Sequence, residues 1–272
     1  MFATSGRARL AYDDTGGEGG ADVLLIHAGV NDRRQLAALE GLLRSRTLAA
    51  LMTAGVSIID PAATYVDTTV VVGRDTVLHP GVRLAGRTAI GEACVIGTGS
   101  QLTDTTIGDR VTLRPYCVLD ESQVEDDATL GPFARLRRGS RIGPGAEVGN
   151  FIEIKQATIG RRVKAHHVGY IGDATVGESA NIGAGTVTCN YDGQQKHQTR
   201  IGARAFVGTN SSLVAPLTIG DDAYVGAGSV ITRDVPAGAL ATERAPQEIK
   251  EGWTERRRGR RPTGSEPAAP NP

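Results

Sequence analysis

The sequence predicts an all-β fold, a parallel β-helix built from hexapeptide repeats. An isoleucine, leucine or valine recurs every six residues through most of the chain. A glycine often follows this branched residue, and the residue four positions after it is usually small, as in Ile142-Gly-Pro-Gly-Ala146. Only 4% of the residues are aromatic, which fits a narrow core that admits few rings. In such a fold each repeat forms one short strand and one turn, three repeats form a coil, and coils stack about 4.8 Å apart.

The elements around the repeats follow in chain order. Leucines at helical spacing over residues 31–54, with Asp32 as a candidate N-cap, predict a linker helix within residues 29–60. The repeats run from Val66 to Pro236 and define a solenoid domain over residues 61–246. A short helix is expected at residues 247–253, and the rest of the segment 247–272 is expected to be a disordered tail with a solvated basic run.

Composition limits the possible functions. The 272 residues include 30 basic and 30 acidic side chains, a balance that argues against a nucleic-acid or membrane-surface role. The sequence has no hydrophobic run of transmembrane length and no signal-peptide pattern, so a cytoplasmic protein is expected. Its three cysteines lack metal or disulfide spacing: Cys94 and Cys117 occupy the small inward position of the repeat, where a buried thiol is expected, whereas Cys189 falls outside that register.

The register of the repeats predicts which charged side chains stack. Arg137 and Lys155 each follow a branched residue, one coil apart, so both are expected on one edge. Two cations held this close repel each other unless an anion lies between them, and a phosphate is the natural candidate. Alternatively, Arg137 and Lys155 could each be an ordinary solvated turn residue.

Two adjacent histidines, His166 and His167, lie at turn and outward positions. A small residue, Ala184, is expected one coil beyond His167, and Tyr170 ends the same repeat near the edge that carries Lys155. An outward imidazole near a cationic edge and a phenol suits a general base, but an ordinary surface histidine fits the same register.

The repeat spacing breaks at Thr188 and returns at Ile201, which predicts a loop ejected from the solenoid. Loops on a rigid scaffold often carry function. Beyond it, Thr209 and Ala227 occupy the same repeat position one coil apart. Such a strip of small residues could line a slot for a long thin ligand, pack against another subunit, or do both.

Five stretches resemble a known family, the bacterial bifunctional N-acetylglucosamine-1-phosphate uridyltransferase/glucosamine-1-phosphate N-acetyltransferases, in their C-terminal acetyltransferase part. They are GPFARLR at 131–137, VGNFIEIK at 148–155, KAHHVGYIGD at 164–173, NIGAGTVTCNYDG at 181–193, and APQ with KEGW within 245–253. The resemblance implies a left-handed β-helix and a homotrimer with active sites between subunits. It also implies acetyl transfer from acetyl-CoA to the amine of glucosamine 1-phosphate, a step toward UDP-N-acetylglucosamine and the cell envelope.

The same resemblance assigns roles to individual residues. His167 would be the base that takes a proton from the amine. The sugar phosphate would be held by Arg137, Lys155, Tyr170 and Asn181 and flanked by the loop residues Asn190, Tyr191 and Lys196. The positions that match acetyl-CoA contacts are Ala184, Thr209, Ala227 and Arg244. Thr209 stands where the family commonly has serine, and His166 replaces a commonly small residue beside the base.

The front of the chain departs from the family. Family members carry a uridyltransferase domain before the linker helix, and nothing here resembles its glycine-rich nucleotide loop, so uridyl transfer is expected to be absent. Asn31 matches a family metal position whose partner ligands are missing, so no metal is expected. Residues 6–28 instead resemble the opening strands of an α/β-hydrolase without its Gly-x-Ser-x-Gly elbow, and we expect the fragment 1–28 to be poorly ordered.

Three alternatives compete with this hypothesis. A γ-type carbonic anhydrase shares the fold but needs three zinc-binding histidines, and the spacing of the histidines in the solenoid resembles no such triad. A catalytically silent trimeric scaffold would carry the same repeats, with apolar surface exposed on the linker helix. An acyltransferase with another acceptor would carry them too.

Overall fold

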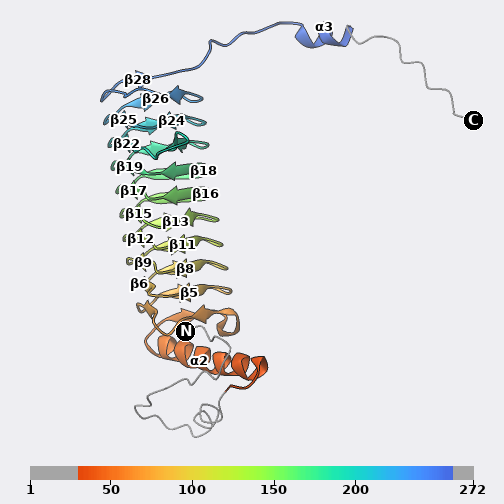
Figure 1. Ribbon diagram of the computed structural model, residues 1–272, viewed down its shortest axis with the longest axis vertical. Helices are drawn as coiled ribbons and strands as arrows, with labels where there is room; N and C mark the ends of the chain where they lie inside the picture. The colour runs from red at the N-terminus through yellow and green to blue at the C-terminus, as the bar shows by residue number, and fades with distance from the viewer. Residues whose placement is uncertain (1–29, 260–272) are drawn as a thin grey trace, which may run out of the picture.

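The computed structural model describes residues 30–259. These residues form a long column of stacked coils, with a helix across the N-terminal end and an extended segment leading away from the C-terminal end (Figure 1). The column is a left-handed parallel β-helix, which confirms the predicted fold class. The expectations for residues 1–28 and for the tail beyond residue 259 fall outside the described residues.

Each coil contributes one strand to each of three faces, and the strands of a face pair in parallel with those of the neighbouring coils. The first face contains β1 Ser57–Ile58, β4 Val77–Leu78, β7 Val95–Ile96, β10 Thr112–Leu113, β13 Thr129–Leu130, the first parts of β16 Glu147–Lys155 and β18 Lys164–Gly172, β20 Asn181–Ile182, β23 Phe206–Val207, β26 Tyr224–Val225 and β28 Leu240–Ala241. The second face contains β2 Tyr65–Val66, β5 Arg83–Ala85, β8 Gln101–Thr103, β11 Val118–Asp120, β14 Arg135–Leu136, the later parts of β16 and β18, β21 Val187–Cys189, β24 Ser212–Val214 and β27 Val230–Ile231. The third face contains β3 Val71–Val72, β6 Ala89–Ile90, β9 Thr106–Ile107, β12 Gln123–Val124, β15 Arg141–Ile142, β17 Thr158–Ile159, β19 Ala174–Val176, β22 Thr199–Ile201 and β25 Leu217–Ile219.

The branched residues of the repeat fill the interior of the column. Leu136 and Ile154 pair across adjacent coils and are fully buried. Cys94 and Cys117 are also fully buried, as predicted, and burial raises the pKa of the Cys117 thiol to about 11. A core of this kind is rigid because each coil packs against its neighbours, so side chains at the corners keep a fixed spacing.

The corner between the first and second faces, here called the first corner, is where β16 and β18 run from one face to the next without a break. It carries a ladder of exposed rings: Phe133 stacks on Tyr116 with centroids 5.3 Å apart and on Phe151 with centroids 5.1 Å apart. All three residues adopt positive φ, between 56° and 62°, which turns the chain sharply enough to point the rings outward. The second corner joins the second and third faces.

The linker helix is α2, Arg33–Thr53, and it begins where the sequence predicts. Asp32 caps it by accepting hydrogen bonds from the backbone N–H groups of the next turn, at 2.8 and 2.9 Å. Leu39 and Leu48 are buried, while Leu36 and Met52 are 45% and 42% exposed, so part of the apolar side of α2 faces outward. Between β1 and β2, the single-turn 3-10 helix η1 spans Pro61–Ala63.

The C-terminal helix lies later in the chain than predicted. It is α3, Trp253–Gly259, so the prediction of a helix at residues 247–253 is wrong in position. Residues 247–250 are irregular, and Gly252 takes a φ of 64° that interrupts any helix before Trp253. Between residues 30 and 259, neither helix is long and apolar enough to cross a bilayer.

Candidate active site

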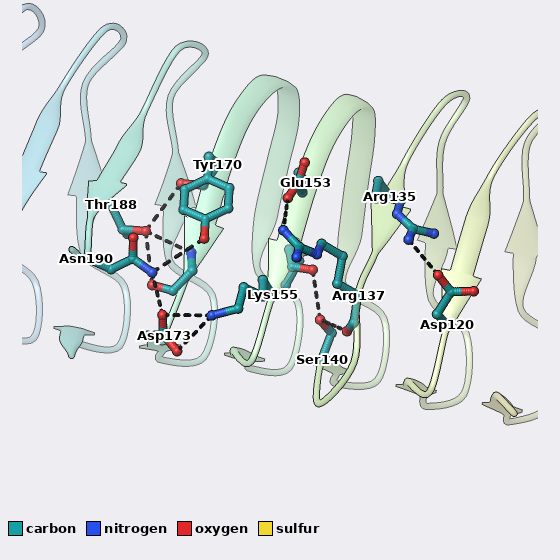
Figure 2. Close-up of polar contacts among 12 residues, drawn as sticks. Asp120, Arg135, Arg137, Ser140, Glu153, Lys155, Tyr170, Asp173, Thr188 and Asn190 are labelled. Atoms are coloured by element: carbon teal, nitrogen blue, oxygen red, sulfur yellow. Dashed lines mark hydrogen bonds and ion pairs between the residues drawn. The ribbon is translucent and has the colours of Figure 1, made fainter. Parts of the chain in front are cut away.

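Two predicted cations stack at the second corner. Because Leu136 pairs with Ile154, Arg137 and Lys155 follow one coil apart on the same corner, as the register predicts. Figure 2 shows Lys155 close to Tyr170, which lies on β18 of the second face, and to Asn190, which follows β21. The rigid spacing of the coils therefore brings side chains from distant parts of the sequence to one place.

Each cation of this corner is paired with a carboxylate from a neighbouring coil. Arg137 Nη1 lies 2.9 Å from Glu153 Oε1, and this bond raises the pKa of Arg137. Lys155 Nζ lies 3.2 Å from Asp173 Oδ2, and the two side chains are only 13% and 14% exposed. The protein's own carboxylates offset part of the repulsion between the two cations, so their stacking does not by itself require a bound anion, and a phosphate between them stays a prediction.

A third cation, Lys196, reaches this corner from the ejected loop. A hydrogen bond in which the Lys155 ammonium donates to the Lys196 amine, together with the carboxylate of Asp173, raises the pKa of Lys155. The same contact, with a smaller contribution from Arg137, lowers the pKa of Lys196. The positive charges of Lys155 and Arg137 therefore disfavour the charged form of Lys196, and an anion bound among these side chains would reverse that effect.

Asn190 and Tyr170 complete the group, here called the donor cluster: Arg137, Lys155, Tyr170, Asn190 and Lys196. Asn190 is 8% exposed, and its Nδ2 donates to Asp173 Oδ2 and, at 3.4 Å, to Tyr170 Oη (Figure 2). Because the phenol oxygen accepts this bond, the phenol hydrogen stays available to a ligand.

The ejected loop is held in a fixed turn by Asp192. Its Oδ1 accepts from two backbone N–H groups of the following turn at 2.8 and 2.7 Å, and its Oδ2 lies 2.7 Å from His197 Nε2. These bonds hold the pKa of Asp192 well below its usual range, and the bond from the Gln195 backbone contributes most. An antiparallel bridge between Tyr191 and Lys196 folds the loop back toward the corner, and Tyr191 itself is exposed.

The histidine pair lies at the first corner, on β18. His167 Nδ1 is 3.1 Å from Oδ1 of Asn150, its register partner on β16. His166 instead turns to the first face, where its Nε2 is 2.7 Å from Glu147 Oε2. Both rings are exposed, as predicted, but they have different partners. Nδ1 of His167 can donate to the Asn150 amide oxygen, and the opposite nitrogen then keeps its lone pair for proton transfer.

The four positions predicted for acetyl-CoA form a column that continues the first corner beyond His167. The register places Ala184 one coil beyond His167, as expected. The carbonyl oxygens of Ala184 and Thr209 accept hydrogen bonds from the next coil at 2.7 and 2.8 Å, which keeps the column continuous. At its end, Arg244 Nη1 donates to the carbonyl oxygen of Ala227 at 2.8 Å.

Asn181 lies apart from the donor cluster. It belongs to β20 on the first face, where its register partners are Lys164 and Phe206. The first corner, with His167, separates it from the second face and from Lys155. The structure therefore gathers Arg137, Lys155, Tyr170, Asn190 and Lys196 and leaves Asn181 on the other side of the histidine.

Three partners of these residues were not singled out from the sequence: Glu153, Asp173 and Asn150. The register of the coils could have found two of them, Asn150 and Asp173, and the alternation of side chains along β16 could have found Glu153. Asn150 pairs directly with His167, and Asp173 lies one coil beyond Lys155. Glu153 precedes Lys155 by two positions, so it projects from the same side of β16.

Comparison of the sequence with known proteins identifies the family to which the chain is related. The family model described as bacterial transferase hexapeptide (six repeats) matches residues 198–233. A bifunctional GlmU protein of Thermotoga petrophila is 51% identical over 238 residues, which cover 87% of this chain and 53% of that protein. The GlmU protein of Heliobacterium modesticaldum is 49% identical over 238 residues, which cover 88% of this chain and 51% of that protein. The chain thus spans about half the length of the curated relatives it matches.

Solved structures show a more distant likeness. A UDP-N-acetylglucosamine acyltransferase of Francisella novicida is 16% identical, with 74% of this chain and 73% of that chain covered and a TM-score of 0.38, too distant to bear on function. The GlmU proteins match most of this chain at about 50% identity over about half of their own length, which confirms the resemblance seen in the sequence motifs. The chain is a hexapeptide-repeat protein related to the C-terminal acetyltransferase half of the bifunctional GlmU proteins.

Proposed function

We propose that this protein transfers the acetyl group of acetyl-CoA to the amine of glucosamine 1-phosphate. The observation that carries the proposal is the donor cluster, in which three cations, a phenol and an amide converge at the second corner, across the second face from His167 at the first corner. Along β18, His167 and Tyr170 are three residues apart, which corresponds to about 10 Å of extended chain. A hexosamine phosphate, with the long side chains of Arg137 and Lys155, can bridge that span.

The phosphate is bound by charge and by hydrogen bonds from this cluster. Lys155 and Arg137 each donate to one carboxylate and keep further N–H groups for a ligand. Bound phosphate also raises the lowered pKa of Lys196, since it supplies the negative charge that the cluster lacks. Anchoring the phosphate fixes the neighbouring amine of the sugar relative to the first corner.

His167 acts as the general base of the reaction. With Nδ1–H donated to Asn150, its Nε2 takes a proton from the amine as the amine nitrogen attacks the thioester carbonyl carbon. The C–N bond forms and the C–S bond breaks, the coenzyme leaves as a thiolate, and the imidazolium returns the proton to the sulfur. No metal is needed for this step, and the acetyl-CoA would lie along the column of Ala184, Thr209 and Ala227, with Arg244 at its end.

The active unit in this proposal is a homotrimer with its sites between subunits. The ladder of Tyr116, Phe133 and Phe151 supports this, because these rings are 45–56% exposed on the same corner as His167. Contiguous exposed aromatic surface marks interaction sites in soluble proteins. The proposed product, N-acetylglucosamine 1-phosphate, would serve UDP-N-acetylglucosamine synthesis in the cytoplasm.

The test follows thiol release from acetyl-CoA with glucosamine 1-phosphate. We expect release that requires the sugar phosphate, that is lost in His167→Ala, and that persists in His166→Ala, because His166 is engaged by Glu147 on the other face. His166→Ala is the matched control, since it removes the same ring from the adjacent position. A folded trimer without release would instead support a silent scaffold or another acceptor, and loss of activity only in His166→Ala would reassign the base.

A further inference from the structure

We propose that Asp173 is the positioning residue of the phosphate site: it orients Lys155 directly, and Tyr170 through Asn190, so that the remaining ammonium hydrogens and the phenol hydrogen face the sugar phosphate. This inference rests on the function proposed above. Asp173 touches two of the five members of the donor cluster and has no expected contact with substrate itself. Its carboxylate lies between Lys155 and Asn190 and contacts both side chains (Figure 2).

The contacts of the Asp173 carboxylate use one hydrogen from each neighbour. Lys155 Nζ lies 3.2 Å from Oδ2 and 3.5 Å from Oδ1, and Asn190 Nδ2 donates to Oδ2. An ammonium group has three N–H donors and an amide nitrogen has two. Lys155 therefore keeps donors, and the carboxylate restricts where these can point, whereas the second amide hydrogen of Asn190 is used by Tyr170.

Asn190 in turn orients the hydroxyl group of Tyr170. The amide nitrogen that donates to Asp173 also donates to Tyr170 Oη at 3.4 Å. The phenol oxygen acts there as an acceptor, so its own hydrogen turns away from Asn190 and toward the open side of the corner. One carboxylate thus sets the direction of the free donors on Lys155 and, through Asn190, on Tyr170.

The backbone holds Asp173 in place from both adjacent coils. Its N–H donates to the carbonyl oxygen of Lys155 at 2.9 Å, and its carbonyl accepts from Thr199 N at 3.2 Å. Its φ of 47° lies in the left-handed region, which aspartate and asparagine tolerate better than most residues. The side chain is 14% exposed, so water competes little for its oxygens.

The chain offers a matched control for this carboxylate. Asp127 also sits at a corner with positive φ, 60°, and is ion-paired, with Arg110 Nε and Nη2 at 2.8 and 3.0 Å. It lies far from the donor cluster, at the corner between the third and first faces. Asp127→Asn therefore removes a comparable charge and ion pair without touching Lys155 or Asn190.

The experiment measures binding of glucose 1-phosphate, which has the phosphate but no amine, by calorimetry, and the KM for each substrate of the acetyl transfer. In Asp173→Asn we expect affinity for glucose 1-phosphate and KM for glucosamine 1-phosphate to worsen about tenfold or more, because a charged hydrogen-bond acceptor is lost. The KM for acetyl-CoA should stay within about twofold, since that column lies on the other corner. Asp127→Asn should match the parent in all three quantities.

If Asp173→Asn does not fold, a second variant, Asn190→Ala, can still test the positioning role of Asp173. Asn190→Ala removes one oriented group but leaves the Lys155–Asp173 pair, so it should weaken sugar-phosphate binding less than loss of Asp173 does. An active parent whose Asp173→Asn variant binds glucose 1-phosphate normally, or whose Asn190→Ala variant loses binding entirely, would overturn the role of Asp173 alone. A parent that neither binds the sugar phosphate nor transfers acetyl would refute the proposed function, and this inference with it.

Discussion

A single added methyl group at Gly149 should disable the site. Gly149 lies on β16 directly below the histidine pair, and an alanine Cβ there would collide with backbone atoms of His166, whose Cα would be only 2.6 Å away and whose carbonyl group would be closer still. Real Cβ atoms essentially never come within 3.0 Å of another heavy atom. Because only backbone atoms are involved, no side chain can move aside, and the two coils must separate by about 1 Å or more.

The size of the effect follows from the hydrogen bonds between the coils. Their N···O distances cannot increase by about 1 Å and remain hydrogen bonds, and losing two or three of them costs about 2–4 kcal/mol. The shift also moves His167 relative to the donor cluster, and a misplacement of about 1 Å lowers a catalytic rate by about 100-fold. We therefore expect Gly149→Ala to be destabilised and nearly inactive, as measured by urea unfolding and by thiol release from acetyl-CoA.

Gly143→Ala provides the comparison. Gly143 also follows a branched residue of the repeat, but its added Cβ would have its closest neighbours at 2.9 Å, and it lies away from both corners of the site. These neighbours are backbone atoms too, but the overlap is much smaller than at Gly149, so this variant should lose less stability and, being away from the site, keep most of its activity. A Gly149→Ala variant as stable and active as the parent would show that the spacing of the coils does not constrain the position of His167.

Three further outcomes can be measured directly. The buried thiol of Cys117, with its pKa raised to about 11, should react with a thiol reagent at pH 8 only after unfolding, and prompt reaction in the folded protein would contradict its burial. Because folding lowers the pKa of Asp192, its contribution to stability is present above its unfolded pKa, near pH 3.9, and is lost as the pH falls through the lower folded pKa. Carboxyl NMR titration should show the lowered pKa, and in His197→Gln this pKa should rise. Phe133→Lys places a charge in the exposed aromatic ladder and should convert the proposed trimer to monomers in sedimentation velocity, whereas an unchanged trimer would place the interface elsewhere.

The sequence determined the architecture of this protein because a β-helix repeats one local rule. A branched residue every six positions and small residues in the turns fix the strand, the corner and the stacking of each coil, so the register alone placed Arg137 beside Lys155 and Ala184 beyond His167. Local signals also located α2, where Asp32 caps the first turn. They failed for α3, because a single left-handed glycine at Gly252 decides where that helix begins.

Only the tertiary structure decided how the charges of the site are balanced. The register gives the position of a Cα atom but not the direction of a long side chain, so it could not show that Arg137 turns to Glu153 and Lys155 to Asp173. Nor could spacing place Lys196, because the loop that carries it follows no repeat. Stacking of coils depends on local backbone geometry, which the sequence encodes, whereas the pairing of charges depends on which side chains reach one another across coils, and that is settled only once the chain has folded.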